Sequence, residues 1–300
     1  MSHSRAVGLM VLVTLMWSIA GVVTRHLDSA RSFEVTFWRS LFNALALVIA
    51  LSVMQGPALW RGIARARWPL WASGLCWAVM YTNFMVAITL TTVATVLVTM
   101  SIAPLVTALF ARLFLQHRLP TRTWAAIGVA GLGIAWMFGR QALEGGSSLT
   151  GILVALGVPL AGATNWTLLQ YIHQRHKTDP GFDEPDMLPA VLIGALLSAA
   201  VTLPLAWPLS ATTHDLSLLG LLGVVQLAIP CLLSVRLARV LPAAEISLLA
   251  LLEVIFGVLL AWVGAGEAPG PTTLLGGALV IGALLANEAL GLRQRRLAAA

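Results

Sequence analysis

Charge is scarce in this sequence. Only 10% of its 300 residues are charged, 59% are apolar, and the mean hydropathy is +0.89. A soluble domain carries about 25% charged residues, so the composition excludes an ordinary soluble protein. Cysteine is equally scarce, and Cys76 and Cys231 both lie within apolar segments. We interpret them as core residues, because this setting suits neither a disulfide nor a metal site.

Motifs for enzymatic chemistry are also missing. The chain has no His-Glu-x-x-His motif, no Gly-x-Ser-x-Gly motif and no phosphate-binding glycine loop. Its six histidines fall in loops or near the ends of apolar segments, and no group of acidic residues indicates a sodium site. We therefore expect no enzyme, no cofactor, no metal and no ATP-driven transport by this chain alone. The net charge of +6 comes from basic residues in short loops, so no nucleic-acid partner is expected.

What the chain does contain is long apolar segments. A membrane-crossing helix needs about 20 such residues, and this template predicts an all-α polytopic membrane protein with ten transmembrane helices. The expected spans are 7–27, 33–54, 68–90, 92–115, 121–139, 150–173, 187–208, 214–236, 241–263 and 271–291. The expected organisation is a five-helix repeat at 1–140, a linker at 141–149, a second repeat at 150–292 and a basic tail at 293–300.

The two halves of the chain resemble each other. Residues 94–133 align with 243–282 at a constant offset of 149, and residues 11–21 align with 152–162 at an offset of 141. Because each half has five expected spans, the halves must have opposite orientations in the bilayer. Inverted repeats of this kind are typical of secondary transporters, whose substrate site lies near the membrane midplane between the repeats. We therefore expect the ten helices to surround a central cavity.

Lysine and arginine predict the orientation. With both termini on one side, 14 of the 18 basic residues lie on that side, 3 lie on the other, and Arg39 lies within the second span. Loops rich in Lys and Arg stay in the cytoplasm. The distribution therefore predicts a multi-pass protein of the plasma (inner) membrane with cytoplasmic N- and C-termini.

Four segments resemble the EamA-type exporters of the drug/metabolite transporter superfamily. They are Trp17-Ser-Ile-Ala-Gly21 in the first span, 95–111 with its proline in the fourth, 247–262 in the ninth, and the final turn Gly266-Glu267 followed by Pro269. The resemblance implies two inverted five-helix repeats and export of small metabolites. Aromatic residues at midspan positions are similar to those of the YddG type, which implies outward transport of aromatic and other bulky neutral amino acids.

The chain departs from the family pattern in two places. Val254 follows Glu253 where the family often has proline, which counts against a kink in helix nine. His117-Arg118 replaces the Gly-Glu turn in the first half. Neither departure affects the expected fold.

Polar and aromatic residues near midspan predict the lining of the cavity, because polar groups that face lipid are costly. The candidate substrate-binding residues are Trp17, Ser18, Trp77, Tyr81, Asn83, Thr99, Ser101, Trp166 and Gln226. Aromatic rings would stack on the side chain of a substrate, and amides and hydroxyls would bind its polar end. The structural alternative is helix packing for the rings and small residues, and interhelical hydrogen bonding for the amides.

Two charged residues lie inside the expected spans. Glu253 is near midspan, where an ionised carboxylate costs about 3 kcal/mol, and the sequence places no Lys or Arg at matching depth. It is therefore a candidate for proton coupling or, alternatively, a fixed hydrogen-bond partner within the bundle. Arg39 lies about 9 Å inside the second span by the helical rise. We expect it to extend outward to the interface or to pair with Glu34.

These features predict a secondary-type transporter that exports small amphipathic metabolites by alternating access, with neutral and aromatic amino acids as the first expectation. The expected partners are this small-molecule substrate and the lipid bilayer, and small-residue faces on spans five and ten permit a monomer or a homodimer. Multidrug or other metabolite efflux is an alternative. A non-transporting membrane scaffold or receptor subunit is another, although scaffolding does not require two opposed halves.

Overall fold

The computed structural model describes residues 1–30, 32–91, 93–116, 119–144, 148–179, 181–266 and 270–299, and all regular structure in these residues is helical. The first half contains α1 (His3–Ser18), α2 (Ala20–Thr24), α3 (Ser32–Gln55), α4 (Ala58–Ala64), α5 (Trp68–Leu90), α6 (Val93–Met100), α7 (Ala103–Leu115) and α8 (Thr121–Glu144). The second half contains α9 (Leu149–Thr178), α10 (Pro189–Ala206), α11 (Thr213–Leu221), the π-helix η1 (Leu222–Ala228), α12 (Ile229–Leu237), α13 (Ala243–Ala250), α14 (Leu252–Ala265) and α15 (Pro271–Ala299). The expected all-α class is confirmed.

Nine stretches of the described residues are long and apolar enough to cross a membrane. They are α1 with α2, α3, α5, α6 with α7, α9, α10, α11 through α12, α13 with α14, and α15. The expected fifth span, 121–139, corresponds to α8, which is not among the nine. Four glycines and two tryptophans within its 24 residues dilute its apolar content. The predicted count of ten spans is therefore not confirmed. The turns at His117-Arg118 and Glu267–Pro269 lie outside the described residues.

Three of these spans are broken into two helices. The first breaks at Ile19, the fourth at residues 101–102 and the ninth at Leu251. The offset of 149 between the two halves maps residues 101–102 onto 250–251, so the fourth and ninth spans break at equivalent positions. In the fourth span Pro104 lacks the N–H that would continue the helix.

The break in the ninth span corrects an expectation. The absence of proline after Glu253 counted against a kink, yet the N–H of Leu251 bonds to the carbonyl of Leu248 at 3.2 Å and the N–H of Val254 bonds to that of Leu251 at 3.2 Å. These are i to i+3 bonds, which tighten the backbone into a turn between α13 and α14 without any proline.

Helices of the first half pack against helices of the second. The α5 helix contacts α9 and α10, α3 contacts α10 and η1, and α1 contacts α12 and α14. The crossing of α5 and α10 is close, because a Cβ on Gly194 would lie 2.3 Å from Trp77 Cβ and 3.0 Å from the carbonyl oxygen of Gly74. This contact determines where α5 holds Trp77.

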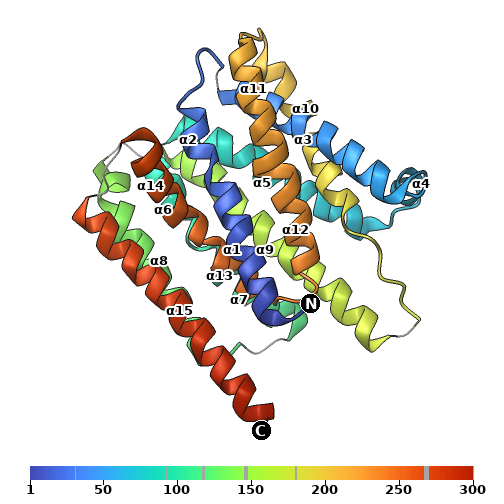
Figure 1. Cartoon of the computed structure of the whole chain (residues 1–300), viewed down its shortest axis with the longest axis vertical. Helices are drawn as coiled ribbons and strands as arrows, with labels where there is room; N and C mark the ends of the chain where they lie inside the picture. The colour runs from blue at the N-terminus through green and yellow to red at the C-terminus, as the bar shows by residue number, and fades with distance from the viewer. Residues whose placement is uncertain are drawn as a thin grey trace.

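The α8 and α15 helices run side by side at one edge of the molecule (Figure 1). The two backbones approach closely at Gly133 and Gly276, where a Cβ on Gly276 would lie 2.4 Å from the Gly133 carbonyl oxygen. Gly128 and Gly282 have nothing within 4 Å of an added Cβ. Gly133 and Gly276 therefore bring the backbones of the expected small-residue faces on spans five and ten together.

Alanine at Gly276 is expected to destabilise this helix pair by about 1–3 kcal/mol, because the clash is with backbone atoms that cannot rotate away. Thermal unfolding in detergent, followed by far-UV circular dichroism, measures the effect. The matched control is Gly282→Ala on the same helix, which adds a methyl group to open space. Equal unfolding temperatures for the two variants would contradict the predicted contact.

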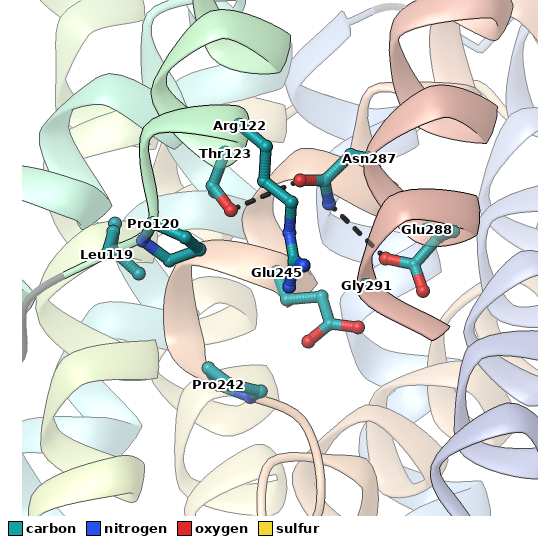
Figure 2. Close-up of a pocket in the computed structure, with 9 residues that line it drawn as sticks. All are labelled: Leu119, Pro120, Arg122, Thr123, Pro242, Glu245, Asn287, Glu288 and Gly291. Atoms are coloured by element: carbon teal, nitrogen blue, oxygen red, sulfur yellow. Dashed lines mark hydrogen bonds between the residues drawn. The ribbon is translucent and has the colours of Figure 1, made fainter. Parts of the chain in front are cut away.

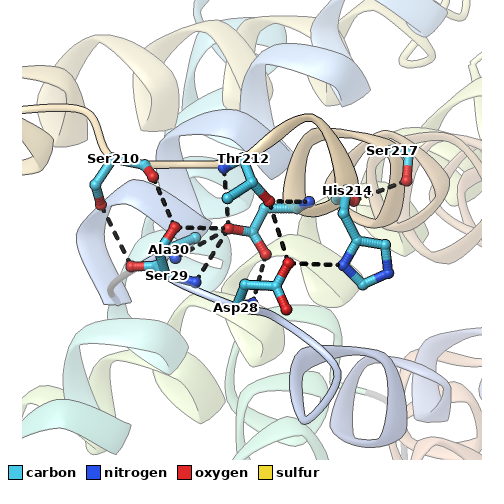
Figure 3. A network of polar contacts seen from close by, with 8 residues as sticks. Asp28, Ser29, Ala30, Ser210, Thr212, His214 and Ser217 are labelled. Atoms are coloured by element: carbon cyan, nitrogen blue, oxygen red, sulfur yellow. Dashed lines mark hydrogen bonds and ion pairs between the residues drawn. The ribbon is translucent and has the colours of Figure 1, made fainter.

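Two buried carboxylates join the α2–α3 turn to the α10–α11 turn. Figure 3 shows both turns, with Asp28, Ser29 and Ala30 in the first and Ser210 and Thr212 in the second. Asp215 is 0% exposed and accepts hydrogen bonds from the backbone N–H groups of residues 28–30 at 2.7–3.2 Å. Glu34 is 2% exposed and accepts hydrogen bonds from the backbone N–H groups of residues 210–211 at 2.7–2.8 Å. Each carboxylate thus belongs to one half of the chain and binds backbone of the other. We call Glu34, Asp215 and these two turns the carboxylate network.

The carboxylate network and the chain termini lie at opposite ends of the molecule. Both termini are toward the lower end in Figure 1, whereas the α2–α3 turn and the start of α11 are toward the upper end. The network therefore ties the two halves together at the end away from the termini.

Candidate functional site

Three aromatic rings meet between α5 and α9. The ring centroids of Trp77 and Tyr81 are 5.7 Å apart, and those of Trp77 and Trp166 are 5.6 Å apart with the planes nearly perpendicular at 88°. All three side chains are 2–6% exposed. Trp77 and Tyr81 share a face because they are four residues apart on one helix, and α9 brings Trp166 from the other half of the chain. The edge-to-face Trp77–Trp166 pair stabilises by about 0.5–1.5 kcal/mol beyond area burial.

A polar contact joins the break in the first span to the π-helix. Gln226, in η1, donates a hydrogen bond from Nε2 to the carbonyl oxygen of Trp17 at 3.2 Å. Trp17 is the penultimate residue of α1, so this bond satisfies a carbonyl next to the break at Ile19. The other amide atom, Oε1 of Gln226, is buried and has no hydrogen-bond partner among the described residues. π-helical segments of this kind are frequently found at functional sites.

Arg39 is the residue that sequence reasoning placed wrongly. It neither extends outward nor pairs with Glu34: it is 3% exposed, and its Nη2 donates to the backbone carbonyl of Tyr81 at 3.3 Å. It also lies close enough to Glu253 for their charges to interact, which corrects the expectation that no basic residue shares the depth of that carboxylate. Cys231 lies within electrostatic range of both. The signal that could have shown this is the charge itself, since a guanidinium within an apolar span must face a partner or a cavity.

Cys231 connects these groups into one cluster. Its thiol is 1% exposed, adjoins the side chains of Trp17 and Tyr81, and lies within electrostatic range of Arg39 and Glu253. The cluster therefore draws residues from α1, α3, α5, α12 and α14, which come from both halves of the chain. Together with Trp77, Trp166 and Gln226 it forms the candidate functional site.

Comparison with known proteins now identifies the chain. The sequence profile described as the EamA-like transporter family matches residues 4–139 and again 149–287. The chain belongs to the EamA-like transporter family. The double match establishes two EamA repeats, and membership makes the protein a multi-pass membrane transporter with a small-molecule substrate rather than an enzyme.

A solved structure titled "Crystal structure of protein" has the same fold. It superimposes on the EamA chain with a TM-score of 0.76, covers 98% of this chain and 99% of its own, and is 18% identical in sequence. That identity is too low to carry anything beyond the fold. No curated protein matches the sequence.

The remaining predicted residues of the EamA protein have hydrogen-bond partners within the protein. The hydroxyls of Ser18, Thr99 and Ser101 donate to the carbonyls three or four residues earlier, at 2.6–2.7 Å. Asn83 donates from Nδ2 to the carbonyl of Val154 at 3.1 Å and so joins α5 to α9. These bonds favour the structural alternative for Asn83, while each hydroxyl oxygen can still accept a hydrogen bond from a ligand.

A separate cavity of about 190 Å³ lies near the starts of α8 and α13 and the C-terminal part of α15 (Figure 2). Its lining residues are Leu119, Pro120, Arg122, Thr123, Pro242, Glu245, Asn287, Glu288 and Gly291. His3 Nε2 lies 2.6 Å from Glu245 Oε1, which places this cavity near the N-terminus of the chain. Since it contains none of the predicted substrate-binding residues, we place the candidate substrate site at the helix breaks of the EamA bundle instead.

Proposed function

We propose that this protein is a YddG-type exporter of neutral and aromatic amino acids that works by alternating access. The observation that carries the proposal is the meeting of Trp77, Tyr81 and Trp166, together with the Trp17–Gln226 contact at the break of the first span. Broken helices at equivalent positions of two opposed repeats are the best pointer to a transporter's binding site. A cluster of aromatic rings suits the side chain of an aromatic amino acid. The adjacent polar atoms suit the charged end of the same molecule.

The proposed transport cycle uses the two repeats as its moving parts. The repeats, at 1–140 and 150–292 with the linker 141–149 between them, would rock against each other and expose the site to one side at a time. The breaks at Ile19 and Leu251 supply positions between the assigned helices at which the halves of a span can turn. In the present conformation the rings contact one another, so entry of a substrate requires the helices around them to separate.

The proposed direction is outward from the cytoplasm across the plasma (inner) membrane. The excess of basic residues on the side of the termini supports cytoplasmic N- and C-termini. The carboxylate network would then lie at the external end. We propose downhill export without a coupling ion; export coupled to protons through Glu253 would instead require wild-type flux to follow a pH gradient imposed across the membrane.

The test is efflux of labelled amino acids from liposomes that contain the purified protein. Saturable efflux is expected, with Phe, Trp and Met preferred over small amino acids. Tyr81→Ala and Trp17→Ala are each expected to lower the rate about tenfold, since each removes aromatic contact worth about 1.5 kcal/mol. The matched control is Trp136→Ala, which removes an aromatic ring from the surface of α8, where it is 60% exposed.

Two results would overturn the proposal. A folded protein that transports no amino acid excludes the amino-acid assignment, and flux of hydrophobic drugs by the same liposomes would then establish multidrug efflux. Binding of a ligand without any flux would indicate a scaffold or receptor subunit. Equal loss in the Trp136→Ala control would show that the aromatic substitutions act on folding rather than on the site.

A further inference from the structure

The guanidinium of Arg39 is buried with most of its hydrogen-bonding capacity unused. An arginine side chain carries five N–H donors in a planar fork, yet the hydrogen bond it makes among the described residues is the single one to the Tyr81 carbonyl. Its Nε is buried and has no partner there. Removing a charge from water costs several kcal/mol unless partners replace the water. A buried guanidinium with free donors is therefore prepared for an acceptor that the chain does not itself provide.

Glu253 supplies the opposite charge on the facing half of the molecule. It lies in the first turn of α14, directly after the break at Leu251, and its side chain is half-buried. Its charge interacts with that of Arg39, but within the described residues the two side chains form no direct ion pair. The two charged groups therefore lie within electrostatic range of each other without direct contact.

Further buried polar atoms without partners in the described part of the chain belong to the same group of helices. Both amide atoms of Asn43, one helical turn from Arg39 on α3, are buried and make no hydrogen bond of normal geometry among the described residues. The same is true of the Tyr81 hydroxyl, which adjoins Asn43, and of Gln226 Oε1. Buried polar groups are normally hydrogen-bonded, so a concentration of unsatisfied donors and acceptors around two opposite charges indicates a place for a polar ligand.

We propose that Arg39 and Glu253 bind the two charged ends of a zwitterionic substrate. The guanidinium would bind the carboxylate through two parallel N–H donors, the geometry in which arginine recognises carboxylates best. Glu253 would accept from the ammonium, and a zwitterion between them would need one hydrogen bond of about 2.8 Å at each end. Because Arg39 also bonds to the backbone of Tyr81, this arrangement places the substrate's side chain toward the Trp77–Tyr81–Trp166 rings.

This inference rests on the proposed function and deepens it, because it restricts the substrates to molecules with both charges. It predicts selection among three ligands that share one ring: L-phenylalanine, L-phenylalaninamide, which lacks the carboxylate, and 3-phenylpropionate, which lacks the ammonium. Calorimetric titration of the purified full-length protein in detergent is expected to show at least tenfold weaker binding of the two truncated ligands. This part of the test needs no variant and therefore does not depend on one that folds.

Substitution of each charge then assigns the ends. Arg39→Gln is expected to weaken binding of L-phenylalanine and 3-phenylpropionate about 30-fold or more, while affinity for the amide stays the same. Glu253→Gln is expected to weaken binding of L-phenylalanine and the amide, with affinity for 3-phenylpropionate unchanged. The controls are Arg236→Gln and Glu184→Gln, which remove one charge of each sign from positions outside the site.

The possible results separate this inference from the proposed function. Equal affinity of the wild-type protein for all three ligands, together with phenylalanine efflux from liposomes, contradicts the charge assignment alone. Uniform weakening of all three ligands by Arg39→Gln also contradicts it, because that pattern shows a structural role. Failure of the wild-type protein to bind or transport any of them contradicts both proposals.

Discussion

Replacing Asp215 with asparagine is expected to destabilise the protein by about 3 kcal/mol and to open the end of the molecule that carries the carboxylate network. Asp215 Oδ1 accepts from the N–H of Asp28, and Oδ2 accepts from Ser29, Ala30 and Thr212. Hydrogen bonds to a charged group contribute about 1.5–3 kcal/mol each. Asparagine removes the charge from all of them and places an amide donor opposite at least one backbone N–H.

The measurement is thermal unfolding in detergent, in which a loss of this size lowers the midpoint by roughly 6 °C. Asp28→Asn is the matched control, because Asp28 belongs to the same turn but its side chain is 57% exposed and pairs with His214 at the surface. An exposed pair contributes about 0–1 kcal/mol, so this variant is expected to unfold close to the wild type. A similar loss in both variants would show that Asp215 is no more important than its exposed neighbour.

Opening of the end that carries the carboxylate network can be measured separately, by alkylation of Cys231. Cys231 is 1% exposed and lies in the candidate site, so in a Cys76→Ala background its alkylation rate reports access to the site. Asp215→Asn is expected to raise this rate several-fold at temperatures well below unfolding, since the two turns no longer hold the halves together. An unchanged alkylation rate with a lowered unfolding temperature would assign Asp215 a role in folding alone.

The spans could be predicted from the sequence because burial in lipid places one strong requirement on each of them, a long apolar run. The start of α5 at Trp68 and of α15 at Pro271 agrees with the expected spans to the residue. The same criterion is ambiguous for α8, because glycine and tryptophan dilute a helix whose partner is another helix, α15, at the Gly133–Gly276 contact. Composition cannot distinguish residues that face lipid from residues that face a neighbouring backbone.

The candidate site was only partly predictable for a related reason. Spacing along one helix places Trp77 and Tyr81 on one face, but which face turns toward Trp166 of the other repeat depends on how the repeats pack. Arg39 shows the limit clearly. The helical rise gave its depth, whereas its burial against the Tyr81 carbonyl depends on the rotation of α3 about its own axis. The break at Leu251, formed without proline, likewise depends on packing around the ninth span.

One contact that determines the position of α3 can be tested directly. A Cβ on Gly223, in η1, would lie 2.6 Å from Phe42 Cβ, 2.7 Å from the Asn43 nitrogen and 2.9 Å from the Arg39 carbonyl oxygen. Two of these three atoms are backbone, so even alanine must push α3 away from η1. We expect Gly223→Ala to cost about 2–3 kcal/mol of stability. In the fraction of the Gly223→Ala variant that folds, we expect amino-acid flux to fall tenfold or more, because Arg39 and Asn43 move away from Gln226.

Gly220 provides the control for this prediction. It lies three residues earlier on the same face of the span, but a Cβ there would meet Phe42 at 3.9 Å, which is ordinary contact. Gly220→Ala is therefore expected to keep wild-type stability and flux, measured by unfolding in detergent and by liposome efflux. If Gly223→Ala behaved like Gly220→Ala in both assays, α3 and η1 could separate without consequence. The close approach of the two repeats at Arg39 would then have no part in transport.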